Sequence, residues 1–279
     1  MKTVSEPIRL TALGLVVNPE RADAIATASH IRAWAKSRGV AVSEDDMSRV
    51  DLVVSLGGDG TVLRAVQMVG DSSAPVLGVN CGTLGYLTTI EPEDAIEVLE
   101  SLYAGTLPTT EKIDERMLLR VDVSKVDGSR HTLRGLNEMV VEKVESGHTV
   151  RLEVAIDGEH FATYSADGLI VATPTGSTAY SLSARGPVVS PAHRALILTP
   201  VSPHMLFDRA LVLDPAQSLS VAVRGHRSVS LAVDGLQFVA LDPGDTVVVS
   251  ADPHVARFIQ VGRRGFHQIL REKFGLGVD

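Results

Sequence analysis

The sequence predicts an α/β protein with three parts: an N-terminal domain built on a parallel sheet, a second β-rich domain, and a C-terminal helix that returns to the first domain. The first observation is that strand-like and helix-like segments alternate between Leu10 and Tyr103, as they do when parallel strands are joined by helices. The second is that short strand-like runs separated by Asp-Gly pairs follow Pro108, as in antiparallel hairpins. A chain of 279 residues has room for two modest domains.

The elements of the first domain follow from apolar runs and their end signals. The apolar run Leu10–Val17 stops at Asn18-Pro19, which is typical of a first strand and its turn. Glu20–Arg38 has apolar residues at helical spacing and ends at Gly39, which predicts a helix. The same signals predict strands at Val50–Leu56 and Pro75–Asn80, and helices at Thr61–Val69 and Pro92–Tyr103.

The second part of the chain is predicted to contain short strands. They are Leu118–Ser124, Asn137–Val141, Arg151–Ile156, Leu169–Ala172, Ala195–Thr199, Leu219–Val223, Val229–Val233 and Thr246–Ser250. Asp-Gly pairs favour tight hairpin turns, and we expect such turns at Asp127-Gly128, Asp157-Gly158, Asp167-Gly168 and Asp234-Gly235. Gly265–Phe274 is predicted to be a closing helix. We therefore expect one domain of residues 1–108 and 255–279, and another of residues 109–254.

The composition excludes several classes of protein. Hydrophobic residues make up 44% and charged residues 22% of the chain, and the formal net charge is −8. This acidic balance argues against a nucleic-acid surface, and no apolar run is long enough to predict a membrane span. A single cysteine excludes an internal disulfide and favours a reducing, cytoplasmic location. Cys81 itself, beside glycines, is better explained as a small buried residue than as a reactive thiol.

The turn Gly57-Gly58-Asp59-Gly60, between a strand and a helix, is suited to binding an anion. Glycines allow a ligand to approach the backbone, and the start of a helix offers free N–H groups. The turn is neither a Walker A loop nor a GxGxxG loop, and Asp59 would repel phosphates unless it had a role. That role could be to take a proton from an attacking hydroxyl or to help bind Mg²⁺. The alternative is a tight turn in which Asp59 only caps the helix.

Two stretches carry a family resemblance. Gly57–Thr61 resembles the signature of a kinase superfamily that includes NAD kinases, diacylglycerol kinases and sphingosine kinases. Asp167–Pro187 reads as a strand, a loop rich in Thr, Ser and Gly, and a helix from Thr178, and it resembles the NAD kinase signature that the lipid kinases lack. Without the resemblance, this loop could equally be a polar connector. Further stretches that resemble NAD kinases are Gly78–Leu87, Leu136–Val141, Thr199–Pro215 and Val233–Phe238.

The resemblance implies a site with named residues. Asp59 would be the general base for the 2′-hydroxyl of the adenosine ribose, Gly58, Gly60 and Thr61 would line the phosphates, and Arg64 would add positive charge. Asn137 and Glu138 would contact ribose and adenine edges, and Asp167 the nicotinamide end. The dinucleotide loop would comprise Thr178, Ala179, Tyr180, Ser181, Leu182 and Ser183, and the late segment would add Asp234 and Gln237. Two further candidates, His148 and Ser165, stand where many bacterial members carry arginine, and Arg185 replaces a common glycine.

The resemblance also implies the reaction and its partners. The protein is expected to transfer the γ-phosphoryl of ATP, bound with Mg²⁺ or another divalent cation, to NAD, giving NADP. A homo-oligomer, a dimer or a tetramer, is expected, with no nucleic-acid or membrane partner. Polyphosphate as donor and NADH as acceptor are left open. A lipid kinase of the same superfamily and a catalytically silent dinucleotide sensor are the competing functions. No paired histidine spacing suggests a structural zinc site, and the residues around Ser177 do not form a hydrolase nucleophile motif.

Overall fold

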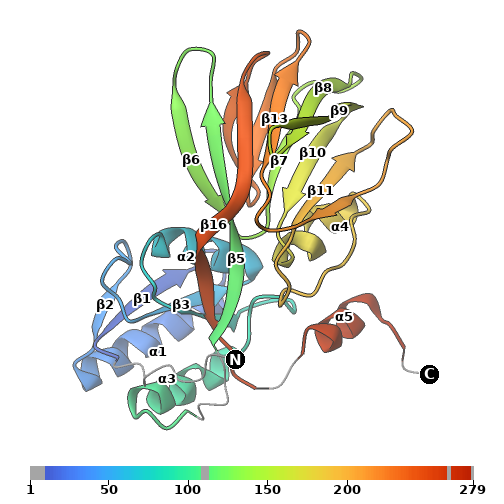
Figure 1. The fold of residues 1–279 in the computed structure, drawn as a ribbon. Helices are drawn as coiled ribbons and strands as arrows, with labels where there is room; N and C mark the ends of the chain where they lie inside the picture. Colours follow the sequence, from blue (N-terminus) through green and yellow to red (C-terminus); the bar gives the residue numbers. More distant parts are fainter. Residues whose placement is uncertain (1–9, 108–112, 263–264, 278–279) are drawn as a thin grey trace. The chain divides into compact units, whose positions relative to one another are not determined.

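The computed structural model describes residues 10–107, 113–262 and 265–277, which form two compact units (Figure 1). The first unit comprises the described residues up to Glu115 and from Ala256 onward, and the second comprises Arg116–Val255. Strands Ile113–Ser124 (β5) and Thr246–Ile259 (β16) each have residues in both units. The domain boundary predicted at residues 108 and 109 lies outside the described residues. Among the described helices, none is long and apolar enough to cross a membrane.

The first unit contains a parallel sheet in the order β2-β1-β3-β4. Its strands are Ala12–Val17 (β1), Ala41–Ser43 (β2), Leu52–Gly57 (β3) and Val76–Asn80 (β4). Its helices are Ala22–Arg38 (α1), Asp59–Val69 (α2), Pro92–Asp94 (η1, a 3₁₀ turn), Ala95–Tyr103 (α3) and Phe266–Phe274 (α5). The parallel sheet expected from alternating strand and helix signals is confirmed.

Alternation along the strands gives the parallel sheet two buried faces. Leu13 and Leu15 of β1 belong to a core that also contains Ile31 and Trp34 of α1 and Leu99 of α3. On the opposite face α2 packs closely, since a side chain at Gly78 of β4 would touch Val62 (Figure 1). A sheet covered on both faces explains why its strands read as continuous apolar runs.

The second unit contains two antiparallel sheets. One contains β5, Arg130–Gly135 (β6), Val150–Ile156 (β8), Glu159–Ala166 (β9), Leu219–Arg224 (β13) and the first part of β16. The other contains Glu138–Lys143 (β7), Gly168–Ala172 (β10), Leu196–Val201 (β11), Leu211–Leu213 (β12), Val229–Val233 (β14) and Leu236–Leu241 (β15). Buried residues of both sheets, such as Leu152 and Val171, form one core. The predicted β-rich fold is therefore confirmed.

Five described strands, β2, β6, β9, β12 and β15, were not predicted from the sequence. Three of them, β6, β9 and β15, each follow a predicted Asp-Gly turn. The pairs at Asp127, Asp157 and Asp234 do connect antiparallel neighbours, and Asp157 and Asp234 have the positive φ values, 51° and 49°, that such turns require. The turn predicted at Asp167-Gly168 is wrong, because it joins β9 to β10 and these strands belong to different sheets. Strands β6 and β9 each begin with three exposed residues and are mostly polar, so they lack an apolar signal. Strand β15 is mostly apolar and was missed despite that signal.

Three smaller boundary differences have local causes. Helix α2 begins at Asp59 and not at Thr61, because the glycine turn itself starts the helix. The helix predicted from Thr178 is a 3₁₀ turn, Thr175–Thr178 (η2), followed by a helix of 4 residues, Tyr180–Ser183 (α4). Strand β16 continues to Ile259, well past the predicted end at Ser250, despite the proline at position 253.

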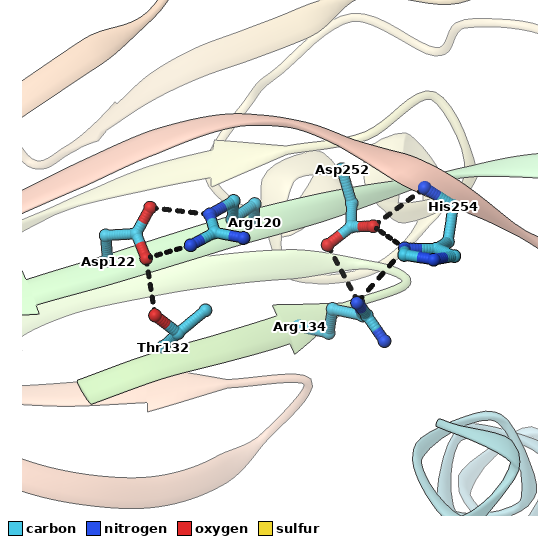
Figure 2. Close-up of polar contacts among 6 residues, drawn as sticks. All are labelled: Arg120, Asp122, Thr132, Arg134, Asp252 and His254. Carbon is cyan, nitrogen blue, oxygen red and sulfur yellow. Dashed lines mark hydrogen bonds and ion pairs between the residues drawn. The ribbon is translucent and has the colours of Figure 1, made fainter. Parts of the chain in front are cut away.

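A charged cluster joins β16 to β6 in the second unit (Figure 2). The buried carboxylate of Asp252 accepts hydrogen bonds from Arg134 Nε at 2.7 Å and from the backbone amide of His254 at 2.8 Å. Burial alone would raise the pKa of Asp252, but the hydrogen bonds from Arg134 and His254 bring it below its usual value. A more exposed pair, Arg120 and Asp122 on β5, lies beside it.

Candidate functional site

A pocket of about 440 Å³ lies in the first unit, past the carboxyl ends of strands β1, β3 and β4. Ligands of open α/β sheets bind at this edge, because the loops that follow the strands meet there. The pocket is lined by Asn18, Pro19, Arg21, Gly58, Asp59, Gly60, Thr61, Arg64, Gly82, Thr83, Leu84, Gly85 and Lys273. It therefore contains every residue that the resemblance assigned to the catalytic and phosphate-binding parts of the site.

The carboxylate of Asp59 is bound to the second glycine-rich loop, between Gly82 and Leu87. Its Oδ2 accepts a hydrogen bond from the backbone amide of Tyr86 and its Oδ1 one from that of Leu87, both at 2.9 Å. The residue that caps α2 is Gly58, and no side-chain hydrogen bond caps this helix. The alternative in which Asp59 only caps the helix is therefore wrong.

Two glycines are required by close contacts around the turn. A Cβ on Gly57 would clash with the side chain of Thr61, and one on Gly85 would clash with Asp59 Oδ1. Thr61 is buried and Asp59 is held by two backbone amides, so neither side chain can move aside freely. These contacts give a physical reason for glycine at both positions.

The pocket carries three basic side chains. Arg64 donates a hydrogen bond through Nη2 to the carbonyl of Val17 at 2.9 Å, which fixes its guanidinium at the pocket. Arg21 and Lys273 line the same pocket, and the sequence analysis missed both. Arg21 directly precedes α1 and Lys273 lies in α5, far from any recognised motif.

The pocket does not form a metal site by itself. Within residues 10–107, 113–262 and 265–277, no group of three or more His, Cys, Asp or Glu side chains could hold a metal ion. Asp59 already accepts two backbone hydrogen bonds and has one free acceptor position on each oxygen. This donor set fits Mg²⁺, which keeps several waters and is bound through substrate phosphates with one or two carboxylates.

A second group of candidate residues lies in the second unit, where Asp234 organises the start of β7. Its carboxylate accepts hydrogen bonds from the backbone amides of Leu136 and Asn137, both at 2.7 Å, and of Glu138 at 3.2 Å. Burial raises the pKa of Asp234, and these three amides oppose that shift. The side chain of Asp234 thus fixes the backbone from which Asn137 and Glu138 project.

Glu138 is a buried carboxylate without a full set of partners. The residue is only 5% exposed, and Oε2 has no hydrogen-bond partner among the described residues. Burial raises the pKa of Glu138 to about 7, the negative charge of Asp234 adds to this, and a backbone hydrogen bond from Tyr180 opposes it. Glu138 therefore does not face solvent. An unpartnered buried acceptor with a raised pKa is typical of a functional site.

The loop rich in Thr, Ser and Gly packs directly against this strand start. A Cβ on Gly176 would clash with the backbone of Asn137, and Thr173 Oγ1 donates to the carbonyl of Leu136 at 2.6 Å. Ser177 donates to the carbonyl of Pro174 at 2.6 Å and is fully buried, so it is a structural residue and not a nucleophile. The loop and the Asn137-Glu138 pair thus form one assembly.

Tyr180 and Asp167 lie in one polar group of the second unit. The Tyr180 hydroxyl donates to Glu142 at 3.5 Å, and Lys143 Nζ forms a 2.6 Å ion pair with Asp167. Burial raises the pKa of Tyr180, and the negative charge of Glu142 raises it further. The ring is partly exposed and available for contact with a ligand.

The remaining predicted residues have simpler environments. Ser165 hydrogen-bonds Thr149 at 3.0 Å, and the buried Ser181 hydrogen-bonds Thr199 at 3.0 Å. Thr178 donates to the carbonyl of Thr175. Exposed positions are occupied by His148, Ser183 and Gln237, and intermediate ones by Ala179 and Leu182.

Comparison with known proteins agrees with this arrangement. Residues 40–107 match the family model for the ATP-NAD kinase N-terminal domain, and residues 136–261 match the C-terminal domain. The NAD kinase of Heliobacterium modesticaldum is 37% identical over 286 residues, covering 96% of this chain and 100% of the relative. That of Moorella thermoacetica is 39% identical over 283 residues, covering 95% of this chain and 89% of the relative.

Solved structures show the same likeness. Yeast NADH kinase in complex with NADH matches with a TM-score of 0.85 and 26% identity, over 97% of this chain and 89% of that one. An NAD kinase from Archaeoglobus fulgidus in complex with ATP matches with a TM-score of 0.71 and 25% identity, over 95% of this chain and 96% of that one. With both family models and near full-length relatives in agreement, the chain belongs to the NAD kinase family.

Proposed function

We propose that the protein transfers the γ-phosphoryl group of ATP to the 2′-hydroxyl of the adenosine ribose of NAD, giving NADP. The observation that carries this proposal is the carboxylate of Asp59, fixed by two backbone amides beside a glycine turn and three basic side chains. Membership of the NAD kinase family supports the choice of acceptor.

Asp59 acts as the general base. The amides of Tyr86 and Leu87 fix its orientation, and each carboxylate oxygen keeps an acceptor position for the proton of a bound hydroxyl. As the hydroxyl attacks the γ-phosphorus, its proton passes to Asp59 and the β–γ bridging P–O bond breaks with release of ADP. A positioned base contributes about 10²–10⁴ to the rate of such a step.

The first unit binds the donor phosphates. The amides of the glycine turn and the N-terminus of α2 provide hydrogen-bond donors for an anion. Gly58 and Gly60 leave room for the anion to approach. Arg64 supplies positive charge from one turn into the helix. When bound with the donor, Mg²⁺ neutralises negative charge on the phosphates.

The second unit binds NAD through the assembly built on Asp234. Asn137 offers a side-chain amide, and Glu138 offers an acceptor that suits sugar hydroxyls. Tyr180 packs on a base, and Thr178, Ser181 and their neighbours line the loop. Asp167 contacts the nicotinamide end. We expect the molecule to work as a homo-oligomer in the cytoplasm, and the donor to be ATP with a divalent cation.

A turnover assay with ATP and NAD, in which NADP is measured, tests this function. Formation of NADP that depends on ATP, NAD and Asp59 supports it. Phosphorylation of diacylglycerol or sphingosine at a comparable rate would favour the lipid-kinase alternative. NAD binding with no turnover under any donor would favour a dinucleotide sensor.

A further inference from the structure

Two basic residues of the Asp59 pocket, Arg21 and Lys273, lie outside the motifs that resemble NAD kinases. They enter the pocket from elements that are far apart in the sequence, the start of α1 and the last turn of α5. Neither side chain forms an ion pair with a described acidic residue, so their positive charges are not neutralised within that part of the protein.

Lys273 is placed by an aromatic ring of the loop that binds Asp59. Its Nζ lies 4.5 Å from the centroid of the Tyr86 ring, within the range of a cation–π interaction. The backbone amide of the same Tyr86 donates to Asp59 Oδ2. One residue thus orients both the carboxylate and the ammonium group, and a cation–π contact leaves the N–H donors of Lys273 free for a ligand.

Arg21 is placed by a glycine of the same loop. A Cβ on Gly82 would lie 2.9 Å from Arg21 Nη2 and 3.2 Å from Cζ, so the guanidinium lies directly against the Gly82 backbone. Gly82 has no positive φ, so the missing side chain, and not the backbone conformation, is what the guanidinium requires. A planar guanidinium that lies open to the pocket is suited to two-point contact with phosphate oxygens.

We propose that Arg21 and Lys273 bind the phosphate chain of the donor nucleotide, so that the C-terminal helix α5 contributes directly to the donor site. This inference rests on the proposed function and extends it to two residues. The pocket already contains one carboxylate, Asp59, which repels a polyanion, and Arg64 alone does not outweigh it. Two further cations give the pocket a net positive charge before the donor and its metal arrive.

The donor nucleotide is favoured over NAD as the ligand of Arg21 and Lys273 because of its charge and because of where the two cations lie. A triphosphate carries more negative charge than the pyrophosphate of NAD and gains more from three surrounding cations. The two cations also share the pocket with the glycine turn and the N-terminus of α2. These elements provide backbone N–H groups that can donate hydrogen bonds to phosphate oxygens. Weakened NAD binding with unchanged ATP binding in variants of Arg21 and Lys273 would contradict this assignment.

The test compares Lys273→Met and Arg21→Met with Lys36→Met, which removes the same charge from an exposed position of α1. Calorimetric titrations with ATP and magnesium, with inorganic triphosphate and with NAD give the binding constants. Each of the first two variants should weaken ATP and triphosphate binding by about tenfold or more, the usual effect of losing a hydrogen bond to a charged group. NAD binding and the melting temperature should stay near wild type, as should every property of Lys36→Met.

Two further variants separate charge from structure. Lys273→Arg keeps the charge and should restore most of the ATP affinity, whereas a purely structural role for Lys273 would not be rescued in this way. Gly82→Ala should push the flexible end of Arg21 aside and weaken triphosphate binding without a loss of stability. If wild type binds ATP but makes no NADP, the proposed function fails. The ATP and triphosphate titrations of the variants still test this inference in that case. If NADP forms and Lys273→Met and Arg21→Met bind ATP and triphosphate like wild type, the inference fails alone.

Discussion

The Asp59 carboxylate and the backbone amide of Leu87 are 28 positions apart in the chain, yet they are joined by a hydrogen bond of 2.9 Å. Together with the bond from Tyr86, it connects the two glycine-rich loops of the first unit. Asp59 therefore has two roles. It provides a base at the pocket, and it orders the loop on which Tyr86 lies, so a variant of Asp59 must distinguish the two.

Asp59→Asn is expected to lower kcat by about 10²–10⁴-fold, because an amide cannot accept the proton of the hydroxyl. NAD should still bind, since its proposed ligands lie in the second unit. The amide NH₂ would face one of the two backbone N–H groups, so the melting temperature should fall as well. Stopped-flow or quenched-flow kinetics and an NAD titration check this prediction. A kcat near that of wild type would exclude Asp59 as the base.

Gly176→Ala is expected to destabilise the protein and to impair NAD binding. The new methyl group would clash with the carbonyl and Cα of Asn137, and the buried backbone on either side cannot move freely. Overpacking of this kind costs roughly 1–3 kcal/mol of the free energy of unfolding. Urea unfolding and an NAD titration measure both effects.

Gly60→Ala is the matched control, because a Cβ at that position meets nothing within 4 Å and the residue lies in helix α2. Its stability should equal or exceed that of wild type, since alanine favours a helix over glycine. Equal unfolding free energies for Gly176→Ala and Gly60→Ala would show that the loop tolerates the methyl group.

The sequence predicted the parts of the fold that have a strong local signal. The buried strands β1, β3 and β4 read as apolar runs because both faces of their sheet are covered. The strands β6 and β9 lacked this signal because most of their residues are polar, whereas β15 is mostly apolar and was missed despite it. The Asp-Gly turns before them could have revealed them, since a hairpin turn implies a strand on each side.

The candidate site was predictable only where glycines and known motifs mark it. The sequence indicated Asp59 and the glycine turn, but the partners of its carboxylate are backbone amides, which carry no residue signature. Arg21 and Lys273 reach the pocket through tertiary packing alone. The burial of Glu138 was likewise hidden, because a polar residue at the start of a strand is usually exposed.

Arg134→Met is expected to destabilise the protein near neutral pH by roughly 1–3 kcal/mol, because it removes a charged donor from the buried carboxylate of Asp252. The pKa of Asp252 is lowered in the folded protein, so its ion pair stabilises the fold above the pKa of an unfolded aspartate, about 4. That stabilisation is lost as the pH falls through the lower folded pKa. The difference between wild type and variant should therefore shrink as the pH falls below about 4.

Arg120→Met serves as the control for this cluster, since Arg120 and Asp122 form a more exposed ion pair in the same region (Figure 2). Its free energy of unfolding should stay close to wild type, because solvent screens exposed pairs. Urea unfolding at pH 7 and at low pH measures both variants. Equal losses in the two would contradict a special role for the buried carboxylate.

Glu138→Ala is expected to weaken NAD binding by at least roughly tenfold, because a buried acceptor for a sugar hydroxyl is removed. The residue has an acceptor, Oε2, without a partner among the described residues, which is the observation that motivates the prediction. Calorimetric titration of NAD into wild type and variant, together with a melting curve, tests it. Equal dissociation constants would leave the ribose contact without an assigned residue.

Glu138→Gln is expected to make the NAD-free protein more stable than wild type above neutral pH. Burial raises the pKa of Glu138 to about 7 in the folded protein, above the value of about 4.3 for a free glutamate, so folding favours the protonated form. The stability of wild type is therefore fully present below about pH 4 and is lost as the pH rises through 7, by roughly 1–3 kcal/mol at pH 8. Glutamine cannot ionise and escapes this loss, so the two unfolding free energies should converge at low pH and separate at high pH. Urea unfolding from pH 4 to pH 8.5 measures the difference, and curves that run parallel over this whole range would show that Glu138 is ionised without cost in the folded state.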